Sequence, residues 1–131
     1  MRIILIVDDD AAFLRALARV LRPLGHQLLL ATDALTAMRA ATHVDHIDLA
    51  ILDLVLGNVS GPEIAARLVS IFPRMKVLYI SGKIDLDPSV PFLSKPINMS
   101  TLIAMVQELL AGGTPEVDTL PSPPPEPGDD E

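Results

Sequence analysis

The feature that most constrains the fold of this chain is a short apolar run that ends in an acid. Leu49–Leu52 form the run, and Asp53 follows it directly. Four apolar residues are too few for a helix, and a run without polar alternation is typical of a strand buried on both faces of a parallel sheet. In open sheets of this class, the chemistry lies outside the carboxyl ends of the strands. We therefore expect Asp53 to stand at a functional edge.

Three more predicted strands also end in polar residues. Strands 3–7, 76–80 and 92–94 are followed by acids, a hydroxyl and an amine. The residues at these three ends are Asp8, Asp9, Asp10, Ser81 and Lys95. A polar strand end can simply meet water, but four ends that carry complementary groups favour one shared site. Because parallel strands bring their carboxyl ends to one edge, we predict that these side chains meet there.

The spacing of apolar residues between the strands predicts helices. Leu14, Leu17, Ala18 and Leu21 recur at i, i+3, i+4 and i+7, which is the pattern of one buried helix face. The predicted strands are 3–7, 27–31, 48–53, 76–80 and 92–94, and the predicted helices are about 10–22, 33–43, 60–72 and 99–111. Strands that alternate with helices form a parallel sheet through right-handed crossovers. The expected fold class is α/β, a flavodoxin-like, doubly wound, five-stranded parallel sheet of order 2-1-3-4-5.

The connection between the fourth and fifth predicted strands is short. Only residues 82–91 join them, and two of these are Pro88 and Pro91. A crossover that contains a helix needs at least ~10–12 residues, so we expect the fourth helix to be missing or reduced. We expect one domain over residues 1–112. Residues 113–131 are rich in proline and acids and offer little apolar surface to bury, so we expect a disordered tail.

The charge of the chain lies mainly in this tail. The formal net charge is −7, and residues 112–131 hold six acids and no base. The rest of the chain is therefore nearly neutral and offers no basic patch for nucleic acid. No apolar run approaches the ~20 residues that span a membrane, and the absence of cysteine excludes disulfides and thiol chemistry. We expect a cytoplasmic protein without a membrane or nucleic-acid partner.

The predicted cluster of acids indicates a metal site. Asp8, Asp9 and Asp53 have no base beside them in the sequence, and three carboxylates in one pocket repel each other. Mg²⁺, or Mn²⁺, resolves this repulsion, because it binds one or two carboxylates and leaves room for phosphate oxygens. A carboxylate can also act as a nucleophile and form an aspartyl phosphate. Lys95 and Ser81 would then face the phosphoryl group.

Four motifs together resemble the receiver domain of two-component response regulators, over residues 1 to about 111. They are Ile-Val-Asp8-Asp9, Asp53-Leu-Val-Leu-Gly-Asn-Val-Ser-Gly61, Ser81-Gly82 and Lys95-Pro96. The resemblance implies that Asp53 is the phosphoacceptor, with Ser81 and Lys95 as its partners. It also implies a cis peptide bond between Lys95 and Pro96. The chain departs from the family at Gly57, where a proline is usual, and in the short connection 82–91.

The resemblance also implies a metal site and a switch. The metal ligands would be Asp8, directly or through water, Asp9, Asp53 and the backbone carbonyl of Val55. Ser81 would be the switch hydroxyl and Phe92 the aromatic that follows it, although Phe92 could also be a simple core residue.

Taken together, these features predict a stand-alone, monomeric phosphorylation switch and not a turnover enzyme. A histidine kinase or phosphotransfer protein would supply the phosphoryl group, self-dephosphorylation would be slow, and the output would go to an unknown downstream protein. Two alternatives stay open. One is a haloacid-dehalogenase-like phosphatase, with Asp8 as nucleophile and Asp10 as the second acid of its Asp-x-Asp motif. The other is an adaptor that works without phosphorylation.

Overall fold

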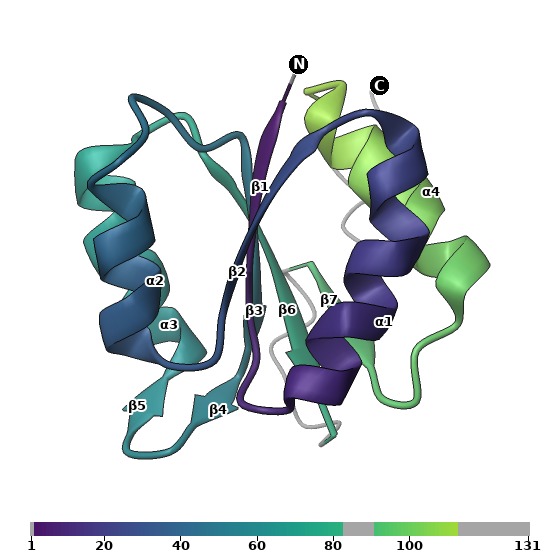
Figure 1. Ribbon diagram of the computed structural model, residues 1–131, viewed down its shortest axis with the longest axis horizontal. Helices are drawn as coiled ribbons and strands as arrows, with labels where there is room; N and C mark the ends of the chain where they lie inside the picture. Colours follow the sequence, from purple (N-terminus) through teal and green to yellow (C-terminus); the bar gives the residue numbers. More distant parts are fainter. Residues whose placement is uncertain (1, 83–90, 113–131) are drawn as a thin grey trace, which may run out of the picture.

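The computed structural model describes residues 2–82 and 91–112, and its centre is a five-stranded parallel sheet (Figure 1). The strands are β1 (Ile3–Val7), β2 (Gln27–Ala31), β3 (Leu49–Asp53), β6 (Lys76–Ser81) and β7 (Phe92–Ser94). They lie in the order β2-β1-β3-β6-β7. When the five strands are counted along the chain, this is the predicted order 2-1-3-4-5, which is thereby confirmed.

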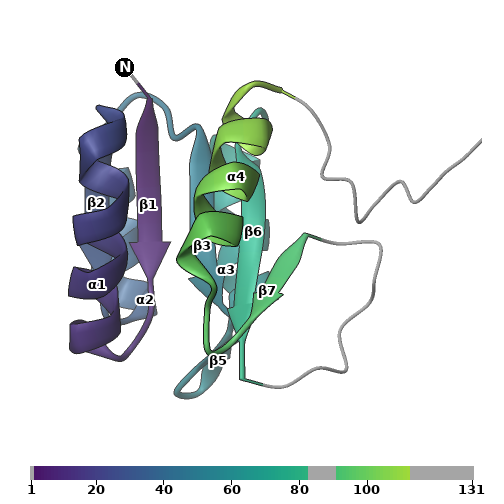
Figure 2. The same ribbon diagram turned by 90° about the vertical axis from the view of Figure 1, so that its right-hand side faces the viewer.

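Helices cover both faces of the sheet (Figure 1). Helices α1 (Ala11–Leu21) and α4 (Met99–Leu110) lie on one face, and α2 (Ala34–Ala41) and α3 (Gly61–Ile71) lie on the other. A short 3₁₀ turn, η1 (Arg22–Leu24), continues α1. Figure 2 shows α1 and α4 in front of the sheet, and the two helices are in contact.

The central strands are buried on both sides, as their apolar sequences predict. In β1, Ile4 and Ile6 face the core beneath α1 and α4, while Leu5 and Val7 face the core beneath α2 and α3. Strand β3 divides its side chains between the same two cores. Because each core packs against its own helix pair, β1 and β3 are held from both faces, and their carboxyl ends are fixed side by side.

A small hairpin that the sequence did not predict follows β3. Strands β4 (Val55–Leu56) and β5 (Val59–Ser60) pair antiparallel. A turn at Gly57 and Asn58 joins them, and Gly57 has a φ of 64°, which favours glycine. The strands have only two residues each, too few for the alternation that identifies a strand in a sequence.

Two expectations fall on residues outside the described part of the chain. The shortened connection between β6 and β7 includes residues 83–90, where the fourth helix was expected to be missing or reduced, and the expected tail is residues 113–131. Four α-helices are found in residues 2–82 and 91–112. None of the helices in these ranges is long and apolar enough to cross a membrane.

The start of α3 lies against the end of β3. The Gly61 N–H donates to the Leu54 carbonyl at 2.8 Å, and Ser60 and Glu63 form a capping box at the helix start. A Cβ atom at Gly61 would lie 2.5 Å from the backbone oxygen of Asp53. Glycine at this position therefore permits the approach that sets the backbone of Asp53.

We expect Gly61→Ala to destabilise the fold by about 1–3 kcal/mol, the usual cost of overpacking. The added methyl group must push against backbone that cannot rotate away. Urea unfolding followed by circular dichroism measures the loss. Gly82→Ala is the matched control, because a Cβ there meets none of the described residues within 4 Å. Equal stability of the Gly61→Ala variant and the wild type would show that the backbone relaxes freely.

Candidate functional site

Three carboxylates meet at the carboxyl ends of β1 and β3. Asp8 and Asp9 follow β1, and Asp53 ends β3. One oxygen from each of the three lies within 4.8 Å of the others. Asp8 is fully buried and Asp53 is 9% exposed, while Asp9 is exposed. The predicted cluster is therefore present, and it reaches solvent at Asp9.

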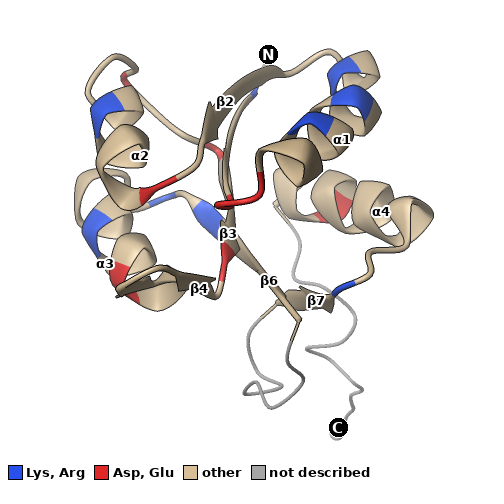
Figure 3. Cartoon of the chain, turned by 60° about the horizontal axis from the view of Figure 1, so that its bottom comes forward, with Lys and Arg blue, Asp and Glu red and all other residues tan. Residues whose placement is uncertain are grey.

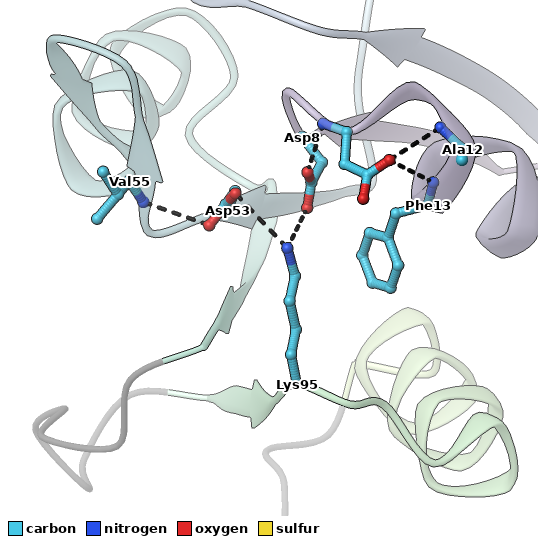
Figure 4. A network of polar contacts seen from close by, with 7 residues as sticks. Asp8, Ala12, Phe13, Asp53, Val55 and Lys95 are labelled. Carbon is cyan, nitrogen blue, oxygen red and sulfur yellow. Dashed lines mark hydrogen bonds and ion pairs between the residues drawn. The ribbon is translucent and has the colours of Figure 1, made fainter.

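Lys95 reaches this cluster from the other end of the chain. Figure 3 shows acidic positions directly before α1 and at the end of β3, and a basic position directly after β7. The Lys95 Nζ lies 3.0 Å from Asp8 Oδ2 and 3.8 Å from Asp53 Oδ2 (Figure 4). The Lys95 N–H also donates to the Ser81 carbonyl at 2.8 Å. The Lys95–Pro96 peptide bond is cis, as the resemblance implied.

Backbone N–H groups hold the other oxygens of the two buried acids (Figure 4). Asp8 Oδ1 accepts from the Asp10 N–H at 2.9 Å. Asp53 Oδ1 accepts from the Val55 N–H at 3.3 Å. Each donor follows its acid by two residues, so the turn after each strand orients the carboxylate. The Oδ2 atoms of Asp8 and Asp53 are then the ones that face Lys95.

The electrostatics of the site follow from this geometry. Burial, together with the charge of Asp8, raises the pKa of Asp53 above its ordinary value, although the Val55 N–H and Lys95 act in the opposite direction. Burial would lower the pKa of Lys95, but its hydrogen bond to Asp8 and the charges of Asp8 and Asp53 outweigh burial and raise it. Among the residues that the structure describes, three carboxylates against one ammonium leave an excess of negative charge.

This donor set fits a divalent cation. Mg²⁺ and Mn²⁺ prefer oxygen ligands, and the three carboxylates offer them within 4.8 Å of one another beside an exposed opening. An ion there would offset the charge that raises the pKa of Asp53. It would also compete with Lys95 for Asp8 Oδ2, which already binds the ammonium at 3.0 Å.

The other predicted residues lie near the cluster in different ways. Ser81 is buried at the end of β6. Phe92 is half-buried in the neighbouring strand β7, opposite Tyr79. Val55 contributes its N–H to Asp53, and the residue is 53% exposed. The switch roles of Ser81 and Phe92, and the Val55 carbonyl as a metal ligand, stay predictions.

Asp10 does not join the cluster. Its Oδ1 accepts from the N–H groups of Ala12 and Phe13, at 3.0 Å and 3.1 Å, and caps α1. This geometry disfavours the phosphatase alternative, because that reaction would use Asp10 as the second acid beside Asp8.

Sequence reasoning missed one neighbour of the site. The ring centroid of Phe13 lies 4.6 Å from the Lys95 Nζ. Phe13 precedes Leu14, the first residue of the predicted helix stripe, and is separated from Lys95 by most of the chain. The signal that could have found it is an aromatic residue in the first helical turn after the acids.

The chain matches known proteins over most of its length. Residues 4–107 match the family model of the response regulator receiver domain. The transcriptional regulatory protein PrrA of Mycobacterium tuberculosis is 30% identical over 115 residues, which are 82% of this chain and 49% of PrrA. The chain thus spans about half the length of this curated relative.

Two solved structures are similar to this fold. The receiver domain of the hybrid histidine kinase CckA has a TM-score of 0.73 and 33% identity, and the match covers 82% of this chain and 98% of that one. A response regulator protein from Burkholderia pseudomallei, with a phosphorylated aspartic acid, a calcium ion and citrate, has a TM-score of 0.72 and 26% identity. That match covers 86% of this chain and 70% of the other.

We expect Asp53→Asn to raise the free energy of unfolding at pH 7 in the absence of divalent cations. The folded protein raises the pKa of Asp53 and so favours its protonated form, which means that ionisation costs stability above the folded pKa. The gain from the substitution should shrink as the pH falls through the folded pKa toward the ordinary value of 3.8. Urea unfolding at pH 7 and at low pH measures both effects.

Asp33→Asn is the control, because this substitution should lower the free energy of unfolding at pH 7 where Asp53→Asn should raise it. The backbone and side-chain hydrogen bonds from Thr36 lower the pKa of Asp33, which is an exposed cap of α2. Its carboxylate therefore stabilises the fold at pH 7, and that stability is lost as the pH falls through its folded pKa. A loss of stability at pH 7 in Asp53→Asn, similar to that in Asp33→Asn, would contradict the charge repulsion described here.

Proposed function

Because this chain belongs to the response regulator receiver domain family, we propose that it is a phosphorylation-dependent signalling switch with Asp53 as its phosphoacceptor. The observation that carries the proposal is the placement of the Asp53 carboxylate. One of its oxygens is held by the Val55 N–H, and the other faces the Lys95 ammonium at 3.8 Å. Asp8 is anchored by two partners, Asp10 and Lys95, and Asp9 is exposed.

In the proposed reaction, an oxygen of Asp53 attacks the phosphorus of a phosphohistidine. The new P–O bond makes an acyl phosphate, and the P–N bond breaks and returns its electron pair to the imidazole. Lys95 would meet the phosphoryl oxygens as a point charge, and the Ser81 hydroxyl would donate a hydrogen bond to them. The protein thus supplies orientation and charge.

Asp8, Asp9, Asp53 and the backbone carbonyl of Val55 are the proposed ligands of Mg²⁺ or Mn²⁺. The bound ion would neutralise charge as the phosphoryl group approaches. The phosphorylated aspartic acid and calcium ion of the similar Burkholderia pseudomallei protein support both parts of the proposal.

The proposed partners are a histidine kinase or phosphotransfer protein, as donor, and a downstream protein that reads the phosphorylated state. We propose that the receiver acts as a monomer and makes no contact with nucleic acid or membrane. Ser81 and Phe92, on the adjacent strands β6 and β7, are the proposed switch pair, and the two strands would carry the change to the partner surface.

We expect acetyl phosphate or phosphoramidate to add one phosphoryl group to Asp53, and only with a divalent cation present. The excess negative charge of the site repels a phosphodonor until a cation offsets it. Intact-protein mass spectrometry should show the added mass in the wild type and not in Asp53→Asn. Asp48→Asn is the control, because Asp48 lies at the amino end of β3, away from the cluster.

A label that survives Asp53→Asn and maps to Asp8 would favour the phosphatase alternative. A wild type that takes no phosphoryl group from small donors or from a phosphotransfer protein would favour the adaptor. Phosphorylation that proceeds fully in the presence of a chelator would remove the proposed role of the metal.

We expect slow self-dephosphorylation and a faster loss of phosphate in Val55→Asn. Hydrolysis needs a water held in line with the acyl phosphate, and the exposed Val55 side chain has no polar group to orient it. An amide can orient water without taking its proton. The rate of hydrolysis should therefore rise about tenfold, which is less than the ~10²–10⁴-fold that general acid–base catalysis contributes. The decay of the phosphorylated mass measures it, with Val55→Thr as the β-branched comparison. Wild-type decay within seconds would contradict the expectation.

A further inference from the structure

An aromatic ring that the proposed reaction does not use lies beside the ammonium of Lys95. The Lys95 Nζ sits over the ring of Phe13, 4.6 Å from its centroid (Figure 4). The face of an aromatic ring attracts a cation within ~6 Å. We propose that Phe13 is a positioning residue that holds the Lys95 ammonium at the carboxylate cluster, where the phosphoryl group arrives. This inference rests on the proposed function.

The backbone fixes Phe13 relative to the acids. Its N–H donates to the Asp10 carboxylate at 3.1 Å, and the Asp10 N–H donates to the Asp8 carboxylate at 2.9 Å. Its half-buried ring packs against the core beneath α1 and α4. The ring and the carboxylate that share the ammonium therefore belong to one short capped segment, and the segment offers Lys95 two partners at a set spacing.

The ring matters because Asp8 and Asp53 do not by themselves hold the Lys95 ammonium in place. Asp8 Oδ2 is its hydrogen-bond partner at 3.0 Å, but Asp8 is also a proposed metal ligand. The 3.8 Å between Nζ and Asp53 Oδ2 is too long for a hydrogen bond. When a cation draws on Asp8, the ring keeps its attraction for the ammonium, since an aromatic ring does not compete for Mg²⁺. Without the ring, a flexible lysine whose side chain is 30% exposed turns more readily to water.

Phe13→Leu tests this role, because leucine keeps an apolar contact with the core and removes the π face. Phe13→Tyr restores the ring and serves as the rescue variant. Ile97→Val is the matched packing control: Ile97 is half-buried against the same core, two residues after Lys95. Thermal unfolding of all the variants measures how much stability each substitution removes.

The first readout is the position of the Lys95 side-chain resonances in metal-free protein labelled with ¹³C-lysine. The chain has three lysines, Lys76, Lys83 and Lys95, and Lys95→Met assigns the signal. A ring face shields the protons above it. We therefore expect the Lys95 Hε signal upfield of the other two lysines in the wild type, Phe13→Tyr and Ile97→Val, and a loss of that shift in Phe13→Leu.

The second readout is the rate of Asp53 phosphorylation by acetyl phosphate at saturating Mg²⁺. We expect Phe13→Leu to lower the rate by roughly two- to thirtyfold, the range that a cation–π contact supports. Phe13→Tyr and Ile97→Val should stay close to the wild type.

Two results would overturn the inference while leaving the proposed function intact. One is a wild-type Lys95 signal without the ring shift. The other is a rate that falls in Phe13→Leu, Phe13→Tyr and Ile97→Val in proportion to lost stability, which would mean that Phe13 only packs the core. A wild type that accepts no phosphoryl group would remove the proposed function, and the reaction role of Phe13 with it.

Discussion

The contact between Lys95 and Asp8 is the interaction on which the rest of the site depends. Two neighbouring parallel strands bring buried carboxylates to one edge, where burial and their mutual repulsion raise the pKa of Asp53. The ammonium at 3.0 Å from Asp8 offsets part of that repulsion. Because 87 residues separate the two partners, the same contact links the first strand of the sheet to the last. A buried carboxylate without such a partner would be strongly destabilising.

Short backbone segments orient one oxygen of each buried acid in the site. The turn after each strand returns an N–H to the acid that ends the strand, at Asp8 and at Asp53. The β4–β5 hairpin and the close approach of Gly61 likewise fix the backbone between Asp53 and α3. Backbone groups held by a sheet and a capped helix lose little entropy when a ligand arrives, which is the arrangement that transfer chemistry requires.

If a divalent cation binds at the three carboxylates as proposed, Asp8 would be shared between two cations, and the site would have two arrangements. In the structure, Asp8 Oδ2 binds the ammonium of Lys95. A metal ion at the three carboxylates would draw on the same oxygen, so the ammonium would be released toward Asp53. The ring of Phe13, 4.6 Å from the ammonium, would then limit where the ammonium goes. Two arrangements of one cluster, biased by bound charge, are the physical basis of a switch.

The sequence by itself determined the strand order, the helix faces and the polar strand ends. The apolar runs of β1 and β3 are too short for helices, and parallel strands must place Asp8, Asp53 and Lys95 at one edge. Only the tertiary structure decided how these groups pair. It placed Lys95 on Asp8 and set Phe13 over the ammonium. The physical reason is range: periodicity and turn chemistry act over a few residues, whereas contacts across the whole chain exist only after the sheet has closed.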